Sequence, residues 1–127
     1  MKASTLKGER IVLQQINTKK DALEWYEIMN DEQMHLWTGN TVSKDISETE
    51  RLLSTYKNHE DLIAWTIEKN DNNKMIGTYW IGVPHLQNNK KIITVEAQRI
   101  GREYWRKGYT REARELANDC QRFFEKK

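Results

Sequence analysis

The segment from Ile100 to Ala113 holds the residue types best suited to binding an anion. It reads Ile-Gly-Arg-Glu-Tyr-Trp-Arg-Lys-Gly-Tyr-Thr-Arg-Glu-Ala, a pattern that predicts a strand end, a basic loop and a helix start. The first turn of a helix has N–H groups without intrahelical acceptors, and its dipole is positive there. Arg106 and Lys107 add charge, and Gly108 lets a phosphate approach the backbone. The segment therefore predicts a pyrophosphate site, with a plain strand–loop–helix junction as the alternative.

Glu96 is the best candidate for a general base. It lies in the strand predicted before the basic loop, where a carboxylate can take a proton from an amine directly or through water. The alternative is an ordinary solvent-facing strand glutamate. Glu103 fits an exposed loop residue. Glu112 fits the first turn of the next helix, where negative charge is favourable, so we interpret it as structural.

The histidines and the cysteine predict no metal site. His35, His59 and His85 are scattered without metal-ligand spacing. Cys120 is the single cysteine, so an intramolecular disulfide is excluded and a reducing compartment is indicated. Its place on the apolar face of the last predicted helix is typical of a core residue. Trp37, close to His35, fits either a binding pocket or an ordinary loop with one buried ring.

Composition narrows the class of protein. The chain has 127 residues and no linker or repeat, which predicts one domain over residues 1–127. With 31% charged residues and a net charge of +2, the chain lacks the strongly basic balance of a general nucleic-acid binder. It also contains no apolar run long enough to span a membrane. No signal peptide is visible at the N-terminus, so the expected location is the cytoplasm.

Periodicity and turn residues predict an α+β fold, with helices packed on a mostly antiparallel sheet. The expected strands are Arg10–Ile16, Leu62–Glu68, Lys74–Val83 and Ile92–Ile100. The expected helices are Asp21–Met29, one that begins near Ser47 with a Ser47/Glu50 capping box, and one from Thr110 onward. Asn70–Asn73 predicts a hairpin turn, and Gln87–Lys90 a polar loop.

The run Tyr104–Ala113 resembles the acetyl-CoA motif of the GNAT superfamily of N-acetyltransferases. It is most similar to the ribosomal-protein-alanine branch, which typically reads Tyr-Trp-Gly-Lys-Gly-Tyr-Ala-Thr-Glu-Ala. Upstream, Leu6–Leu13 is similar to the opening strand of that family and Asp21-Ala22 to the start of its first helix. Ala64–Ile67 and Met75–Gly77 are similar to its central hairpin. The resemblance thus covers nearly the whole chain in order.

The resemblance implies that acetyl-CoA is the cosubstrate and that no metal takes part. It implies that the CoA pyrophosphate lies on the loop and first helical turn formed by Arg106, Lys107, Gly108, Tyr109, Thr110 and Arg111. It also implies that the pantetheine arm runs along the strand end at Gln98, Arg99 and Ile100. The usual reaction of the family is direct attack of an amine on the thioester, which the protein assists by positioning, an oxyanion contact and a base.

The sequence departs from the family in three ways. Arg106 stands where the loop has its first glycine, so its side chain either crowds the cofactor or binds a phosphate. Thr110 replaces a small residue. The strand, helix and strand that normally follow the last helix are not in the sequence. A naturally short protein, a fragment and a chain completed by a partner are the open explanations.

A homodimer is the expected assembly. The Ile92–Ile100 strand would have an unpaired edge, and Phe123 or Phe124 would be exposed at the end of the last helix. The alternative is a monomer whose edge is shielded by Lys90, Lys91 and Arg99.

Three functions are compatible with these features. The first is an N-acetyltransferase acting on a primary amine, either a protein N-terminus or a small molecule. The second is a non-catalytic acyl-CoA-binding or dimerisation module derived from that fold. The third is a nucleic-acid-binding protein in which Tyr104, Trp105 and Tyr109 interleave with basic residues, which the near-neutral charge disfavours.

Overall fold

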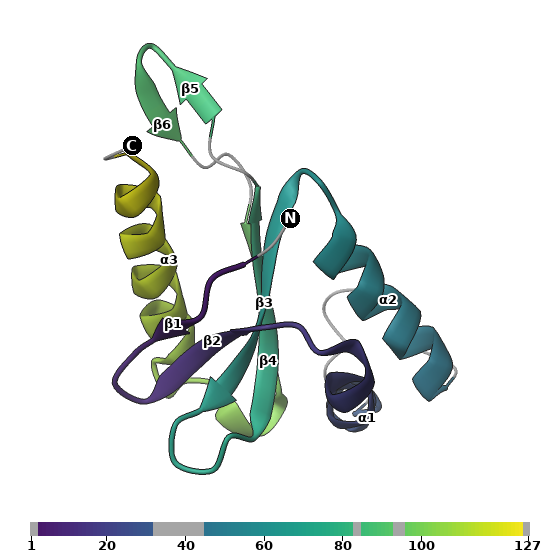
Figure 1. The fold of residues 1–127 in the computed structure, drawn as a ribbon. Coiled ribbons are helices and arrows are strands. Elements are labelled where there is room, and N and C mark those ends of the chain that lie inside the picture. Colours follow the sequence, from purple (N-terminus) through teal and green to yellow (C-terminus); the bar gives the residue numbers. More distant parts are fainter. Residues whose placement is uncertain (1–2, 32–44, 83–84, 93–95, 126–127) are drawn as a thin grey trace.

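A five-stranded sheet lies between two helical layers. The computed structural model describes residues 3–31, 45–82, 85–92 and 96–125, excluding the side chains of residues 85–87, 90–92 and 119–125. Helices α1 (Thr18–Met29) and α2 (Ile46–Asn58) cover one face of the sheet, and α3 (Tyr109–Glu125) covers the other (Figure 1). The predicted α+β architecture is confirmed.

The strands of this sheet follow the order β1-β2-β3-β4-β7, and every neighbouring pair is antiparallel. Their bounds are Leu6–Lys7 (β1), Ile11–Gln15 (β2), Leu62–Lys69 (β3), Met75–Gly82 (β4) and Glu96–Ile100 (β7). The turn between β3 and β4 lies at Asn70–Asn73 as predicted, with Asn73 in the left-handed region at φ 55°. Strand β1 is not predicted by the sequence because two residues carry too little periodicity to be recognised.

The predicted strand Ile92–Ile100 is confirmed from Glu96 onward and is wrong at Ile92, while residues 93–95 lie outside the described residues. Ile92 ends β6 (Lys90–Ile92), which pairs with β5 (His85–Gln87) in a separate hairpin that projects beyond the sheet (Figure 1). Asn88 and Asn89 form the turn of this hairpin, with φ values of 53° and 66°. Asparagine tolerates this region better than most residues, and two consecutive positive φ angles suit a two-residue hairpin. The expected polar loop is therefore a hairpin turn.

Both early helices begin before their predicted starts. The first begins at Thr18 because the Asn17 side chain accepts a hydrogen bond from the Lys20 amide at 3.2 Å. The second begins at Ile46, where Asp45 caps it by accepting from the Glu48 amide at 2.8 Å. The predicted Ser47/Glu50 capping box is thus wrong. The Asp45 side chain, two residues earlier, offers the cap instead, and Ser47 lies inside the helix.

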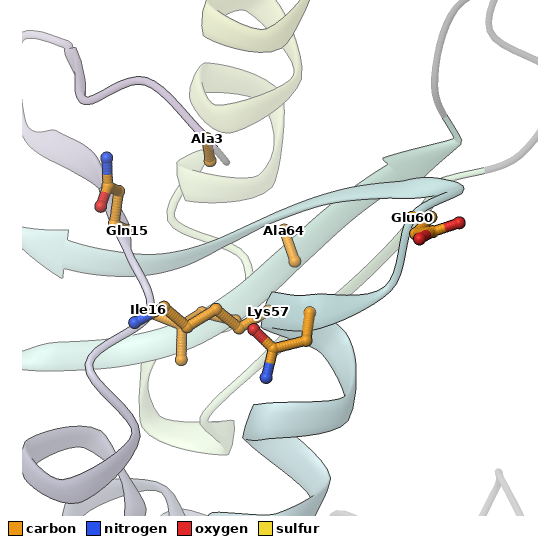
Figure 2. A pocket seen from close by; sticks show the side chains of 7 residues that line it. Ala3, Gln15, Ile16, Lys57, Glu60 and Ala64 are labelled. Atoms are coloured by element: carbon orange, nitrogen blue, oxygen red, sulfur yellow. The ribbon is translucent and has the colours of Figure 1, made fainter. Parts of the chain in front are cut away.

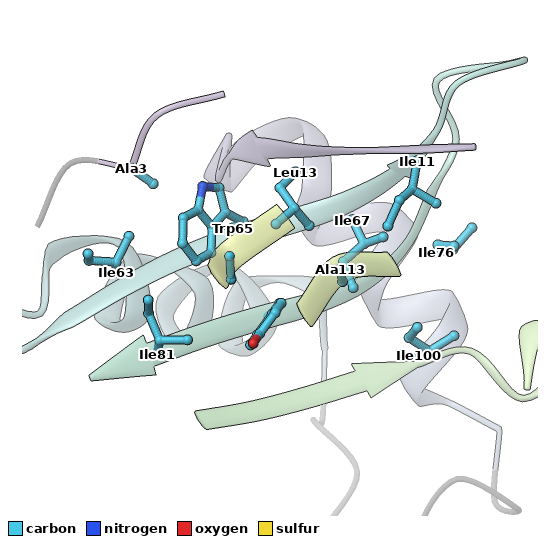
Figure 3. Packing of buried hydrophobic residues seen from close by; sticks show 12 residues of the cluster. Ala3, Ile11, Leu13, Ile63, Trp65, Ile67, Ile76, Ile81, Ile100 and Ala113 are labelled. Carbon is cyan, nitrogen blue, oxygen red and sulfur yellow. The ribbon is translucent and has the colours of Figure 1, made fainter. Parts of the chain in front are cut away.

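Two hydrophobic clusters hold the layers together. Between the sheet and α3, Leu13, Trp65 and Ile67 are fully buried against Ala113 and its neighbours (Figure 3). On the other face lie the buried residues Ile16, Ala22, Trp25, Met29, Leu53, Ala64 and Met75. The buried residues thus include Ala22, Trp25 and Met29 of α1 and Ala113 and Ala117 of α3.

Some residues that the sequence singles out cannot be placed. His35 and Trp37 lie outside the described residues. Cys120, Phe123 and Phe124 belong to α3, but their side chains are not described.

Candidate functional site

The basic loop joins the end of β7 to the start of α3. After Ile100 the chain makes a short 3₁₀ turn, Arg102–Tyr104, and the helix begins at Tyr109. The Glu112 amide donates to the Gly108 carbonyl at 3.1 Å, a bond of the helical i to i−4 type. By helix geometry, the N–H groups from Gly108 to Arg111 have no acceptor within the helix. The predicted order of strand, loop and helix is therefore present, and it brings the basic loop next to N–H groups of a kind that can hold an anion.

Two residues of the loop have left-handed backbone conformations. The φ angle is 64° at Arg106 and 84° at Gly108. Glycine adopts this region freely, whereas a residue with a Cβ does so at a cost of about 1 kcal/mol or more. The conformation explains why glycine suits both positions in the motif that this segment resembles. Arg106 therefore keeps the glycine-type backbone and adds an exposed side chain.

Three side chains hold backbone carbonyls along this segment. The Trp105 indole donates to the Ile100 carbonyl at 2.7 Å, and the Gln98 amide donates to the Thr110 carbonyl at 3.0 Å. The Arg10 guanidinium donates to the Lys107 carbonyl at 2.7 Å. The strand end, the loop and the first helical turn are thus each tied to the rest of the site by one such bond.

Arg10 is a site residue that the sequence analysis misses. Its Nε donates to Glu112 at 2.9 Å, its backbone N donates to the same carboxylate at 2.8 Å, and its guanidinium lies 4.7 Å from the centre of the Tyr109 ring. It was predicted only as the first residue of a strand. An arginine that starts a strand carries no local signal of a partner about 100 residues away.

Glu112 anchors the start of α3 to the opening strands. It accepts hydrogen bonds from the backbone amides of Arg10 and Ile11 and from the Arg10 side chain. Partial burial opposes ionisation, but these hydrogen bonds outweigh it and hold the pKa of Glu112 below its usual value. The carboxylate is therefore ionised at neutral pH and holds the strand start against the helix, which agrees with its interpretation as structural.

Exposed basic side chains of the loop border a hollow whose lining contains both acidic and basic residues. Arg106, Lys107 and Arg111 are exposed. A hollow of about 350 Å³ lies beside them, lined by Gly8, Glu9, Arg10, Gly108, Arg111, Glu112, Glu115 and Leu116. A polyanion at the loop would meet both backbone donors and mobile charge.

The β7 residues predicted to contact a cofactor point to different faces. Gln98 faces α3 through its bond to Thr110, and its Oε1 is buried with no partner among the described residues. Arg99 and Ala97 line a cavity on the α1 and α2 face, and Ile100 is buried in the core beneath α3. These residues therefore do not form one row of side chains. The surface that they could offer together to a ligand is the backbone of β7.

Glu96 is held by two donors on the α3 face. Its Oε2 accepts from the Tyr79 hydroxyl at 2.6 Å and its Oε1 from Arg114 Nε at 2.9 Å. Burial, together with the hydrogen bond to Glu96, raises the pKa of Tyr79 above its usual value. The phenol therefore stays protonated and donates at neutral pH. Both carboxylate oxygens of the predicted base are thus engaged.

An aromatic cavity of about 180 Å³ lies on the opposite face of β7. It is lined by Trp25, Met29, Leu52, Tyr56, Thr78, Trp80, Ala97, Gln98 and Arg99. Flat rings beside a few polar groups are typical of small-molecule pockets. Because side chains alternate along β7, Glu96 projects away from this cavity while Ala97 and Arg99 line it.

A larger, open hollow lies at the far end of β2 from the basic loop. It has a volume of about 640 Å³ and lies between the end of α2 and strands β2 and β3 (Figure 2). Its lining combines Gln15, Ile16 and Ala64 with the charged residues Lys57 and Glu60. None of the residues predicted to bind a cofactor lines it, so it is separate from the basic loop.

The described part of the chain contains neither a cluster of metal ligands nor a helix that could span a membrane. No group of three or more His, Cys, Asp or Glu side chains there is arranged to hold a metal ion. None of the helices in that part is long and apolar enough to cross a membrane.

Solved structures share this fold. The chain is similar to a GNAT-family acetyltransferase from Bacillus anthracis (TM-score 0.68, 17% identity, 90% of this chain and 63% of that one). It is similar to Mycobacterium smegmatis RimJ in complex with CoA-disulfide (TM-score 0.72, 19% identity, 93% of this chain and 61% of that one). It is also similar to the microcin C7 self-immunity acetyltransferase MccE in complex with acetyl-CoA and AMP (TM-score 0.65, 18% identity, 87% of this chain and 61% of that one). The chain thus spans between 61% and 63% of the length of these proteins.

The family comparison agrees with the structural one, although no curated protein sequence matches the chain. A family model described as an acetyltransferase (GNAT) domain matches residues 10–125, which include both Arg10 and the whole of the basic loop. The match covers most of the chain, and the chain therefore belongs to the GNAT acetyltransferase domain family.

Proposed function

We propose that this domain binds acetyl-CoA and transfers its acetyl group to a primary amine. The observation that carries the proposal is the junction of β7 and α3, where N–H groups of Gly108 to Arg111 without helical acceptors adjoin exposed basic side chains. Membership of the GNAT family supports it. So do the structural relatives that hold CoA-disulfide or acetyl-CoA.

The pyrophosphate would lie on the backbone between Arg106 and Arg111, where N–H donors and the helix dipole stabilise negative charge. The pantetheine arm would run along the outer edge of β7, at Gln98 to Ile100. That edge is open to a ligand because β7 is the last strand of the sheet among the described residues. Hydrogen bonds from an extended arm would replace those of a further strand.

The acceptor would enter from the aromatic cavity beside β7. The amine nitrogen attacks the thioester carbonyl, so a C–N bond forms, the C–S bond breaks and the thiolate of CoA leaves. The amine loses one proton to a base, and the thiolate takes up one proton to give free CoA. A protein N-terminus and a small-molecule amine are both suitable acceptors for this step.

Glu96 is our proposed base. Its carboxylate lies on β7 next to the edge assigned to the pantetheine arm, which supports the proposal. It would have to release Tyr79 or Arg114, or act through a water molecule that reaches around the strand edge.

The second candidate is a non-catalytic acyl-CoA-binding or dimerisation module. The two donors that engage Glu96 favour it, since a carboxylate bonded to a phenol and a guanidinium is not poised for an amine. We also propose a homodimer, in which the β7 edge pairs with a second copy, and a cytoplasmic location.

Calorimetry with acetyl-CoA, followed by an assay against a panel of amines, tests the proposal. We expect micromolar to submillimolar binding by the native chain and loss of binding in Gly108→Asp. That substitution adds a Cβ where φ is 84° and a negative charge beside the phosphates. Lys7→Gln, which alters an exposed residue of β1, is the matched control and should bind normally.

The outcomes separate the two candidates. Acetylation of any amine in the panel supports the transferase. Binding without acetylation supports the acyl-CoA-binding module. Absence of binding at millimolar acetyl-CoA contradicts both functions, whereas equal binding by Gly108→Asp contradicts the placement of the site at this loop.

A further inference from the structure

Arg10 contacts three residues of the junction between β7 and α3. Its Nη1 donates to the Lys107 carbonyl at 2.7 Å, its Nε donates to Glu112 at 2.9 Å, and its guanidinium lies 4.7 Å from the centre of the Tyr109 ring. Its backbone N donates to Glu112 as well, at 2.8 Å. One residue from the opening strand thus meets the loop and the first turn of α3.

The bond to the Lys107 carbonyl constrains the next N–H group. In a trans peptide the C=O and the N–H point in opposite directions. The carbonyl of the 107–108 peptide is turned toward Arg10, so the Gly108 N–H points away from it. That N–H is the first of the donors at the start of α3 that have no acceptor within the helix.

The rest of the environment keeps Arg10 in place. Glu112 bonds both its backbone and its side chain, and Tyr109 stacks on its guanidinium. A Cβ at position 108 would come within 3.1 Å of Arg10 Nη2. The absence of a side chain at Gly108 therefore leaves the room that the guanidinium occupies.

We propose that Arg10 is the positioning residue of the pyrophosphate site, which it serves by orienting the 107–108 peptide so that the Gly108 N–H faces the ligand. The inference rests on the proposed function, because it assigns a role within the same anion site. Arg10 itself approaches the loop from the side of the carbonyl, and its charge is paired with Glu112. Its contribution is thus geometric, and a positive charge alone does not supply it.

The test compares CoA binding by the native chain and by Arg10→Met, Arg10→Lys and Asp45→Ala, each checked for folding by thermal melting. Arg10→Met and Arg10→Lys should weaken CoA at least about 10-fold. A lysine has a single donor group and cannot reach Glu112 and the Lys107 carbonyl in one plane as a guanidinium does. Asp45→Ala removes the cap of α2 and lowers stability in the other helical layer, so its CoA affinity should stay within about 3-fold of the native value.

A second measurement follows the Gly108 amide directly. With only 6 glycines in the chain, its signal in a ¹⁵N correlation spectrum is readily assigned. It should shift between the native chain and Arg10→Lys without ligand, and should respond to CoA strongly only in the native chain. Lowered stability alone would not change the signal in this way while the protein remains folded.

Three outcomes overturn the inference. Native-like CoA affinity in Arg10→Lys would show that charge is sufficient. Equal weakening in Asp45→Ala and Arg10→Met would assign the effect to lost stability. Normal binding in Arg10→Met would remove the role of Arg10 while leaving the proposed function intact, whereas no CoA binding by the native chain would contradict the proposed function itself.

Discussion

The side chains nearest the proposed chemistry are already linked to one another. Glu96 accepts from the Tyr79 hydroxyl and from Arg114, which lies one turn into α3 from Thr110. The Glu96–Arg114 pair is largely exposed, so its contribution to stability is small. Its importance lies in what it does to the carboxylate that we propose as the base. The proposed activity therefore depends on whether Glu96 can exchange these donors for the amine or a water.

Replacing Glu96 by Gln tests the base directly. We expect kcat/KM to fall about 10²-fold or more, and the fall in rate on the acidic side of the pH profile to disappear. Glu103→Gln, which removes the same charge from an exposed loop position, is the control and should leave the rate unchanged. A pH profile in Glu96→Gln that keeps the native shape would show that another group takes the proton.

Asp21 is the buried acid of the opposite layer. Its side chain is 1% exposed, and Oδ1 has no hydrogen-bond partner among the described residues. Burial raises the pKa of Asp21 to about 6, with Glu68 and Glu24 adding to the shift and the Asn17 amide and Lys20 opposing it. The folded state therefore binds a proton that the unfolded chain has lost between about pH 4 and 6.

Because the pKa of Asp21 is higher in the folded state than in the unfolded chain, its contribution to stability falls as the pH rises. The stabilisation by protonated Asp21 is complete below its ordinary pKa of 3.8 and is lost as the pH rises through about 6. Asp21→Asn stays neutral throughout and can still accept from the Asn17 amide. From pH 4 to 7 its free energy of unfolding should therefore rise by about 2–3 kcal/mol relative to the native chain. Denaturant unfolding at several pH values measures this, and a constant difference would contradict the pKa assignment.

At the scale of elements, capping residues determine where the helices begin. Asn17 and Asp45 each precede a helix by one residue and accept from an amide of its first turn. Asp45 also accepts from the Thr49 amide through its carbonyl, at 3.2 Å. These bonds satisfy donors that would otherwise lose their hydrogen bonds, and they explain why both helices start earlier than the apolar pattern suggests.

Two alanine substitutions separate the observed cap of α2 from the predicted one. Asp45→Ala should lower the free energy of unfolding by about 1 kcal/mol, because the Glu48 amide loses its acceptor. Ser47→Ala, two residues later and exposed within the helix, should change it by less than about 0.5 kcal/mol. Urea midpoints with an unchanged slope give both values. A larger loss of unfolding free energy in Ser47→Ala than in Asp45→Ala would show that Ser47 caps the helix.

For the whole molecule, the arrangement of layers decides which surface is available to a ligand. The sheet is covered on one face by α3 and on the other by α1 and α2, and β7 lies at its edge (Figure 1). The anion-binding loop follows directly from this edge, and the aromatic cavity lies beside it. A pantetheine arm and a strand of a second copy would therefore use the same backbone groups.

That shared edge makes the proposed dimer sensitive to cofactor. In sedimentation experiments at micromolar concentration, the native chain should be dimeric alone and should dissociate with saturating acetyl-CoA. Gly108→Asp should stay dimeric in both conditions because it does not bind the cofactor. A single monomeric species without acetyl-CoA would refute the dimer, and a dimer unaffected by the cofactor would place its interface elsewhere.

The sequence by itself determined the elements and the chemical character of one segment. Short apolar runs bounded by turn residues predict β3 and β4, and helical spacing predicts the apolar faces of α1 and α3, because burial imposes those patterns locally. The basic residues, Gly108 and the helix start are neighbours in the chain, so the anion site that we propose at Arg106–Thr110 is readable from local spacing. The Asn88-Asn89 pair is typical of a polar loop as well as of a hairpin turn, so the sequence predicts a strand start at Ile92 where the structure begins β7 at Glu96.

Only the tertiary structure decided how distant residues meet. Arg10 and Glu112 are in contact across about 100 residues, and no local pattern encodes such a pairing. Alternation along β7 shows that Glu96 and Ala97 face opposite ways, but only packing shows that Glu96 faces Tyr79 and Arg114. Burial of Asp21 likewise depends on α1 lying over the sheet. These properties arise when layers pack together, since the environment of a side chain is set by neighbours that the chain brings in from elsewhere.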